Sequence, residues 1–266
     1  MFRAAIEGLI DTEGLRFEPV TSDTQSLNDA AGRGEVDISA ISVAAYPYLA
    51  ERFVLFGHGG SVGMNYGPVI VARSGHSIAE LAGMRIATPG ERTTAHLVTR
   101  LIAPTATFTT VPITPYESVF DAIERGDVDA GIIIHEGRLT YPLHGLAKIV
   151  DLGEWWYTEH GLPLPLGANV IRRALGADVI ARASRVLQRS IGWALEHRDE
   201  MIEFLITHVH RPAEVATHEL LDRYLGMYAN EETYEYTEPS RRAIQMLLDL
   251  GAERGLLPHT ITAEYV

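Results

Sequence analysis

Three groups of residues in this sequence have types and positions suited to small-molecule chemistry. The first is His135, which directly follows the apolar run Ile132–Ile134. A histidine at the end of a buried strand can act as a general base, because its pKa lies near neutrality and burial favours the neutral imidazole. The same position also suits a histidine that is only hydrogen-bonded within the core. Its position alone favours neither interpretation.

The second group is the helix start at Thr93, Thr94 and Ala95, in the segment TPGERTTAHLV. This segment predicts a strand end, a Pro-Gly turn and the first turn of a helix, whose free N–H groups and positive dipole end bind carboxylates and other anions. A threonine at this place can also be a simple N-cap. Capping and binding are compatible, so the sequence predicts an anion site here.

The third group is the glycine-rich loop GHGGSVGMNYGP, in which Gly59–Gly63 match the pattern G-x-S-x-G of serine hydrolases. That motif requires a helix directly after the serine. The following residues predict a strand at 69–72 instead, which argues against a hydrolase. Gly59 and Gly60 are therefore interpreted as loop positions whose backbone can approach a ligand closely.

A repeated pattern predicts the elements that position these groups. The segments LNDAAGRGEVDISAIS and VFDAIERGDVDAGIII each indicate a helix, a glycine turn that closes it, and a buried strand. Chain crossings at 67–75 and 162–175 predict two α/β domains, an outer one of residues 1–75 and 169–266 and an inserted one of residues 76–168. Open α/β sheets bind ligands beyond the carboxyl ends of their strands. We therefore expect Ser42 and His135, which follow the two repeated strands, to face each other across the interdomain cleft.

The composition excludes several function classes. The 266 residues carry a net charge of −13, which argues against nucleic acid or an anionic membrane surface as the partner. Zero cysteines exclude disulfides and thiolate metal sites, and the pair His208-x-His210 lacks further ligands, so no metal site is predicted. No apolar run is long enough to span a bilayer. The start, MFRAAIEGLIDTEG, predicts an amphipathic first helix of a cytoplasmic protein rather than a secretion signal.

Longer motifs carry a resemblance to a known family. The runs IIIHEGRLTYPLHGL and VDLGEWWYTEHGLPLPLGANVIRR, with TPGERTTAHL and HGGSVGMNYGPVIVAR upstream, resemble the 1,4-dihydroxy-6-naphthoate synthases of the futalosine route to menaquinone. The resemblance implies an α/β, two-domain fold like the type II periplasmic binding proteins, with a ligand cleft between the domains. It implies a carbon–carbon lyase with His135 as the base, and no metal or organic cofactor. The implied substrate contacts are Ser42, Thr93 to Ala95, the loop at Gly59 and Gly60, and Arg138 of the His-Glu-x-Arg element.

The partners expected from this resemblance are a small anionic substrate and, optionally, a second copy in a homodimer. Family members begin with a strand that carries Ser-Pro-Cys-Pro-Asn-Asp-Thr-Phe, whereas this sequence begins within the helix that follows. We expect either a start codon assigned downstream of the true one or a trimmed relative. Two alternatives stay open: a solute-binding protein for a small carboxylate, and a relative of chorismate dehydratase, against which the His-Glu-x-Arg and Trp-Trp elements argue.

Overall fold

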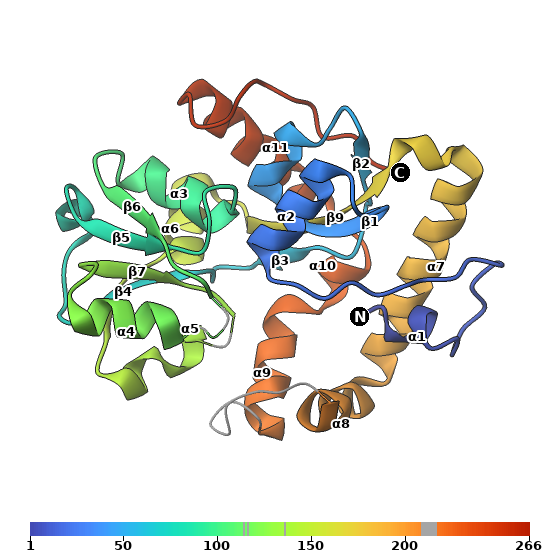
Figure 1. Cartoon of the computed structure of the whole chain (residues 1–266), viewed down its shortest axis with the longest axis horizontal. Helices are drawn as coiled ribbons and strands as arrows, with labels where there is room; N and C mark the ends of the chain where they lie inside the picture. Colours follow the sequence, from blue (N-terminus) through green and yellow to red (C-terminus); the bar gives the residue numbers. More distant parts are fainter. Residues whose placement is uncertain (114, 116, 136, 209–216) are drawn as a thin grey trace.

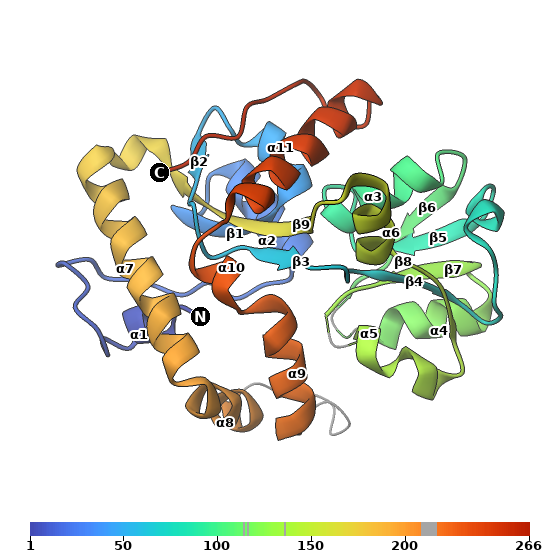
Figure 2. The same cartoon turned by 180° about the vertical axis from the view of Figure 1, so that it is seen from behind.

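The computed structural model describes residues 1–113, 115, 117–135, 137–208 and 217–266, and shows two β-sheets, each covered by helices (Figures 1 and 2). In the first sheet, β9 lies between β1 and β2 and also pairs with β3, all antiparallel. The bounds of these strands are β1 (Ile38–Ser42), β2 (Phe53–Leu55), β3 (Ser61–Gly63) and β9 (Leu164–Arg172). We call this sheet with its helices the first lobe.

The second sheet has five strands in the order β6, β5, β7, β4, β8 and defines the second lobe. Its strands are β4 (Val69–Ala72), β5 (Arg85–Thr88), β6 (Thr107–Thr110), β7 (Ala130–Ile133) and β8 (Ala147–Asp151). Strand β5 is parallel to both β6 and β7, whereas β4 is antiparallel to both β7 and β8. The carboxyl ends of β5 and β7 therefore lie at the same edge of the sheet.

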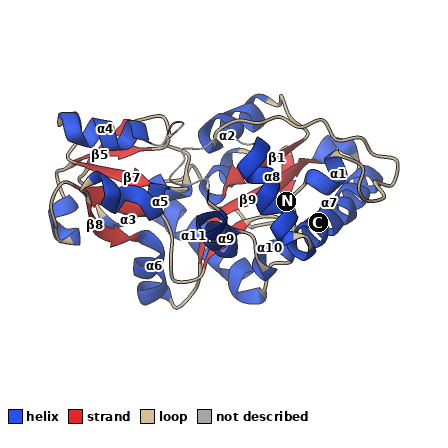
Figure 3. Ribbon diagram, turned by 90° about the horizontal axis from the view of Figure 1, so that it is seen from below, coloured by secondary structure: helices blue, strands red, loops and turns tan. Residues whose placement is uncertain are grey.

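The helices lie around the two sheets (Figure 3). Long helix α7 and C-terminal helix α11 bury the apolar stripes that the sequence indicates, including Val186 and Leu247. The helical elements are α1 (Arg3–Ile6), α2 (Thr24–Arg33), η1 (Val43–Tyr48), η2 (Ile78–Leu81), α3 (Thr94–Ile102), α4 (Glu117–Arg125), α5 (Gly137–Thr140), η3 (Tyr141–His144), α6 (Leu152–His160), η4 (Arg173–Leu175), α7 (Ala177–Glu196), α8 (Arg198–His208), α9 (His218–Tyr228), α10 (Glu231–Tyr234) and α11 (Glu238–Glu253).

Both copies of the repeated pattern form the elements that the sequence predicts. Helix α2 ends at Gly34 and leads into β1, and helix α4 ends before Gly126 and leads into β7. Each glycine has a φ of 76°, in the left-handed region that a side chain disfavours. The helix–glycine–strand unit is therefore specified locally in each lobe.

Two sequence-based boundaries differ from the structure. The sequence places β4 in the outer unit, residues 1–75, whereas in the structure Val69 pairs with Ile133 of the second sheet, so the chain crosses before β4. All of β4 is buried, and a fully apolar strand does not reveal which sheet it joins. The first helix is also shorter than predicted: α1 covers Arg3–Ile6 and Gly8 follows with a φ of 71°.

The apolar core continues from one lobe to the other. A single cluster of buried side chains contains Ile41 and Leu55 of the first sheet together with Ile86 and Ile132 of the second. Leu97 of α3 belongs to the same cluster. The two lobes are therefore packed against each other rather than joined only by the crossing strands.

Candidate functional site

His135 lies where β7 ends and before α5 begins. Its φ is 54°, which places a residue with a side chain in the left-handed region at a cost of about 1 kcal/mol or more. The imidazole is half-buried, and its Nδ1 lies 3.3 Å from the Tyr224 hydroxyl of α9. A side chain of the second sheet therefore meets a helix from the C-terminal part of the chain. Glu136, the second residue of the His-Glu-x-Arg element, lies outside the described residues.

Ser42 lies at the end of β1, opposite Gly167 of β9, and its side chain is buried. Its backbone N–H donates to Asn28 Oδ1 over 2.9 Å, and the Asn28 amide nitrogen lies 3.4 Å from Ser42 Oγ. Asn28 is a buried polar residue of α2 that the sequence analysis missed. The signal that could have found it is its place on the same helix face as buried Ala31.

The start of α3 is held by the two threonines that the sequence singles out. Thr93 is the N-cap: its Oγ1 accepts from the His96 N–H and donates to the Gly90 carbonyl. Thr94 Oγ1 donates to the Leu166 carbonyl over 2.8 Å and accepts from the Ala44 N–H over 3.3 Å. Thr94 therefore joins α3 to β9 and to the segment after β1.

The same helix start has donors that these contacts do not use. Within the described part of the chain, the backbone N–H groups of Thr94 and Ala95 have no acceptor, as is usual for the first positions of a helix. An anion at this place would bind to these amides, because both hydroxyls are already engaged. The helix dipole favours negative charge there as well.

The glycines of the loop are required for packing. A Cβ on Gly60 would lie 1.9 Å from the Tyr236 hydroxyl and 2.4 Å from the Gly167 carbonyl. Gly59 has a φ of 81°, and its N–H donates to the Thr233 carbonyl over 2.6 Å. The groups that approach this backbone closely are therefore other parts of the first lobe.

Arg138 forms a buried ion pair. Its guanidinium donates to Asp151 Oδ2 over 2.5 Å, and Asp151 also caps α6 by accepting from the Gly153 N–H. Burial raises the pKa of the Asp151 carboxyl, and the Arg138 charge opposes that rise. A second guanidinium nitrogen lies 3.5 Å from the Met227 sulfur of α9. Arg138 and His135 thus both reach α9 from the second lobe.

The structure brings the predicted residues together in two separate groups. His135 and Arg138 lie against α9, while Ser42 and Thr94 meet β9 at Gly167 and Leu166.

Among the described residues, no three His, Asp or Glu side chains are arranged to hold a metal. His210 lies outside those residues, so the His208-x-His210 pair is not tested. No helix in the described ranges is long and apolar enough to cross a membrane.

Comparisons with known proteins agree on one family. A family model for menaquinone biosynthesis matches residues 2–253. The chain is 35% identical over 256 residues to a 1,4-dihydroxy-6-naphthoate synthase of Thermus thermophilus, covering 96% of this chain and 90% of the relative. It is also 35% identical to a protein of the same name from Streptomyces coelicolor, over 89% of this chain and 83% of that one.

Solved structures with the same fold include an archaeal protein and an alkanesulfonate-binding protein. A crystal structure of an Archaeoglobus fulgidus protein has a TM-score of 0.88 at 37% identity, covering 96% of this chain and 93% of that one. The alkanesulfonate-binding protein of Xanthomonas axonopodis has a TM-score of 0.65 at 17% identity, covering 90% and 83%. The fold is therefore that of the periplasmic binding proteins, as the sequence analysis expects.

Proposed function

Since this chain belongs to the menaquinone-biosynthesis family, we propose that it is a 1,4-dihydroxy-6-naphthoate synthase acting in the cytoplasm. The proposed reaction is the cleavage of cyclic dehypoxanthinyl futalosine to 1,4-dihydroxy-6-naphthoate. The observation that carries the proposal is the 35% identity to two synthases of that name over most of the chain.

In the proposed mechanism, His135 removes a proton from the bound substrate. The electron pair left by that proton then drives an elimination in which a carbon–carbon bond to the sugar-derived carbons breaks. The sugar-derived fragment leaves as the second product, and formation of the aromatic naphthoate drives the step. Two features support this role: the strained backbone at His135, since such strain concentrates at functional sites, and the Tyr224 hydroxyl that orients the imidazole. The Arg138–Asp151 pair would act on His135 indirectly, by fixing the turn after β7 against α6.

The substrate carboxylate would bind the amides of Thr94 and Ala95 at the positive end of α3. The sugar hydroxyls would lie near Ser42 and the loop at Gly59 and Gly60. Ser42 and both glycines are buried, and the glycines are covered by Tyr236 and Thr233 of the first lobe itself. This part of the proposal therefore requires a movement within the first lobe, as well as separation of the lobes, when substrate enters. The Thr94 contacts with Leu166 and Ala44 are among those that such a motion would break.

The test is to incubate the purified chain with cyclic dehypoxanthinyl futalosine and to measure the naphthoate by mass spectrometry. His135→Asn is the informative variant, because asparagine tolerates a positive φ and cannot act as a base. We expect its rate to fall by about 100-fold or more, while the melting temperature stays near that of the parent. An undiminished rate would remove His135 from the mechanism.

Assays of the unsubstituted protein distinguish the three function classes. Tight binding of the substrate without turnover would favour a solute-binding protein for a carboxylate. Dehydration of chorismate would favour the dehydratase alternative. Either outcome contradicts the proposed function without depending on any variant.

A further inference from the structure

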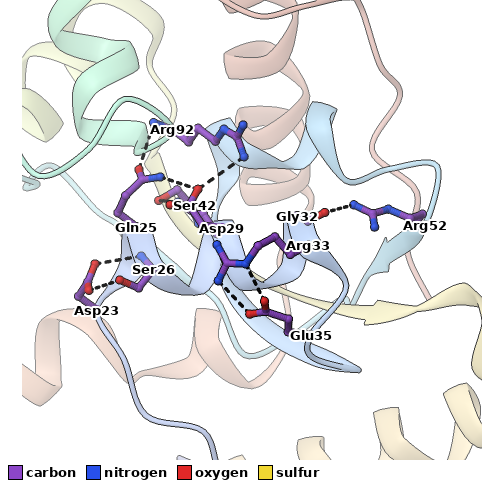
Figure 4. A network of polar contacts seen from close by, with 11 residues as sticks. Asp23, Gln25, Ser26, Asp29, Gly32, Arg33, Glu35, Ser42, Arg52 and Arg92 are labelled. Atoms are coloured by element: carbon purple, nitrogen blue, oxygen red, sulfur yellow. Dashed lines mark hydrogen bonds and ion pairs between the residues drawn. The ribbon is translucent and has the colours of Figure 1, made fainter.

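A surface depression of about 400 Å³ lies beside α2, and none of the residues proposed to bind or convert the substrate line it. Three of its lining residues are arginines, and the others are Asp29, Gly32 and Tyr48. The arginines come from three places: Arg33 from α2, Arg52 from the turn before β2, and Arg92 from the loop before α3 (Figure 4). In a chain with a net charge of −13, three cations around one opening form a local excess of positive charge.

Two of the arginines converge on Gly32. Arg52 donates from its guanidinium to the Gly32 carbonyl. On the other side, a guanidinium nitrogen of Arg92 lies 3.5 Å from the point where a Cβ of Gly32 would be. Because Gly32 has no side chain, the face of α2 beside the Arg92 guanidinium stays open. Both arginines line the same depression, and a planar guanidinium group offers paired donors that suit phosphate oxygens.

The existing ion pairs leave hydrogen-bonding capacity at this place. Arg33 is engaged by Glu35 through two bonds of 2.7 and 2.8 Å. Arg92 lies 3.6 Å from Asp29, longer than a hydrogen bond, and Asp29 already accepts from Gln25. Arg52 has no carboxylate within 4.0 Å in the part of the chain that the structure describes. Arg52 and Arg92 therefore keep donors for a further anion.

We propose that this depression is a binding site for phosphate or a phosphate monoester, held by Arg52 and Arg92 and distinct from the helix start at Thr94 and Ala95. The Tyr48 ring lies beside the Arg92 guanidinium, 5.0 Å from its centroid, and is 44% exposed. An aromatic base attached to the phosphate could stack on this ring.

The position of the site gives the bound anion a structural effect. Arg52 belongs to the first lobe and Arg92 to the second, and the Arg92 N–H already donates to Gln25 of α2. Arg92 is also paired with Asp29 of α2, so a phosphate held by Arg52 and Arg92 adds a further connection between the lobes at this point. Binding therefore stabilises the arrangement in which the loop of Arg92 rests against α2.

The experiment measures binding of inorganic phosphate and of AMP by calorimetry and by melting temperature, at constant ionic strength. We expect a dissociation constant of about 1 mM or tighter, and a rise in melting temperature of about 3 °C at tenfold excess over that constant. Arg52→Ala is expected to weaken binding about tenfold or more. Arg16→Ala, which removes an exposed arginine whose ion pair within the described residues is with Glu18 alone, is the matched control and should leave binding unchanged.

Two substitutions at Gly32 test whether the anion needs the open volume of the depression, without changing the charge around it. Gly32→Leu places a large side chain in the depression beside the Arg92 guanidinium and should abolish binding, whereas Gly32→Ala, whose Cβ would make an ordinary contact at 3.5 Å, should retain most of it. Tighter binding of AMP than of phosphate would assign a phosphate monoester, and equal binding would assign free phosphate. Binding that is undetectable, or equal in Arg52→Ala and the parent, would overturn the proposal. These readouts need no catalytic turnover, so they are independent of the proposed function.

Discussion

Acidification is expected to destabilise this protein through two buried histidines. His58 belongs to the glycine-rich loop, and its Nε2 lies 3.1 Å from Ser184 Oγ. His96 lies in α3, and its Nδ1 lies 3.2 Å from Thr88 Oγ1. Burial lowers the pKa of each from 6.5 to about 4. Within the described residues, Nδ1 of His58 is buried without a partner, so a proton added there would find no acceptor.

The direction in which stability changes with pH follows from the protons bound by the folded and unfolded chains. Between pH 6.5 and about 4 the unfolded chain binds protons at both histidines and the folded chain does not, so stability falls as the pH falls through this window. The full effect is about 3 kcal/mol for each histidine, at about 1.4 kcal/mol per pH unit. From pH 7 to about pH 5.5 the two together cost about 2 kcal/mol, which lowers the melting temperature of a chain of this size by about 4–8 °C.

The assay is thermal unfolding followed by circular dichroism over this pH range. His58→Gln and His96→Gln cannot be protonated, so each should remove about half of the pH dependence, whatever its effect at pH 7. His259→Gln changes an exposed side chain and should keep the dependence of the parent. The reasoning fails if both buried-histidine variants retain the full dependence, because other groups would then be responsible for it.

Three further predictions concern stability. Arg138→Met leaves the Asp151 carboxylate buried without its cation and should lower the free energy of unfolding by about 3–5 kcal/mol in urea titrations. Adding Asp151→Asn should restore part of the lost stability. An absence of restoration would contradict the argument that the two residues form a stabilising pair. Gly60→Ala places a methyl group against a tyrosine hydroxyl and a β9 carbonyl and should lower the free energy of unfolding by about 1–3 kcal/mol. In the control Gly75→Ala, the added methyl group meets nothing within 4 Å, so the same assay should show no change. Thr94→Val removes the hydroxyl between the lobes and should cost about 1–3 kcal/mol, while Thr94→Ser should retain most of the stability measured by thermal unfolding. Unchanged stability in Thr94→Val would show that the hydroxyl is unimportant.

Local signals in the sequence were sufficient for much of the fold. The Arg-Gly junctions at Gly34 and Gly126 predict a helix end and a strand because the backbone there needs a positive φ. The sheet to which β4 belongs could not be predicted in the same way. Its four buried residues pair with strands that come much later in the chain, and that pairing leaves no local pattern.

In the candidate site, too, local patterns predict where residues lie along the chain but not which distant residues they contact. The positions of Ser42, Thr94 and His135 at strand and helix ends follow from local patterns, and the structure places them at those ends. Their partners come from distant segments: Tyr224 for His135 and Leu166 for Thr94. Such contacts depend on how α9 and β9 pack in three dimensions, which spacing in the sequence does not encode.

Strand β9 also dictates an order of assembly during synthesis. Strands β1, β2 and β3 each pair with β9, and all strands of the second sheet lie between β3 and β9 in the chain. As the polypeptide leaves the ribosome, the second sheet has every strand it needs before the first sheet has its central one. The contacts of the first sheet therefore join residues that are far apart in the sequence, which gives the first lobe the higher contact order. Its strands β1, β2 and β3 have no β9 to pair with until the strands of the second sheet have been synthesised.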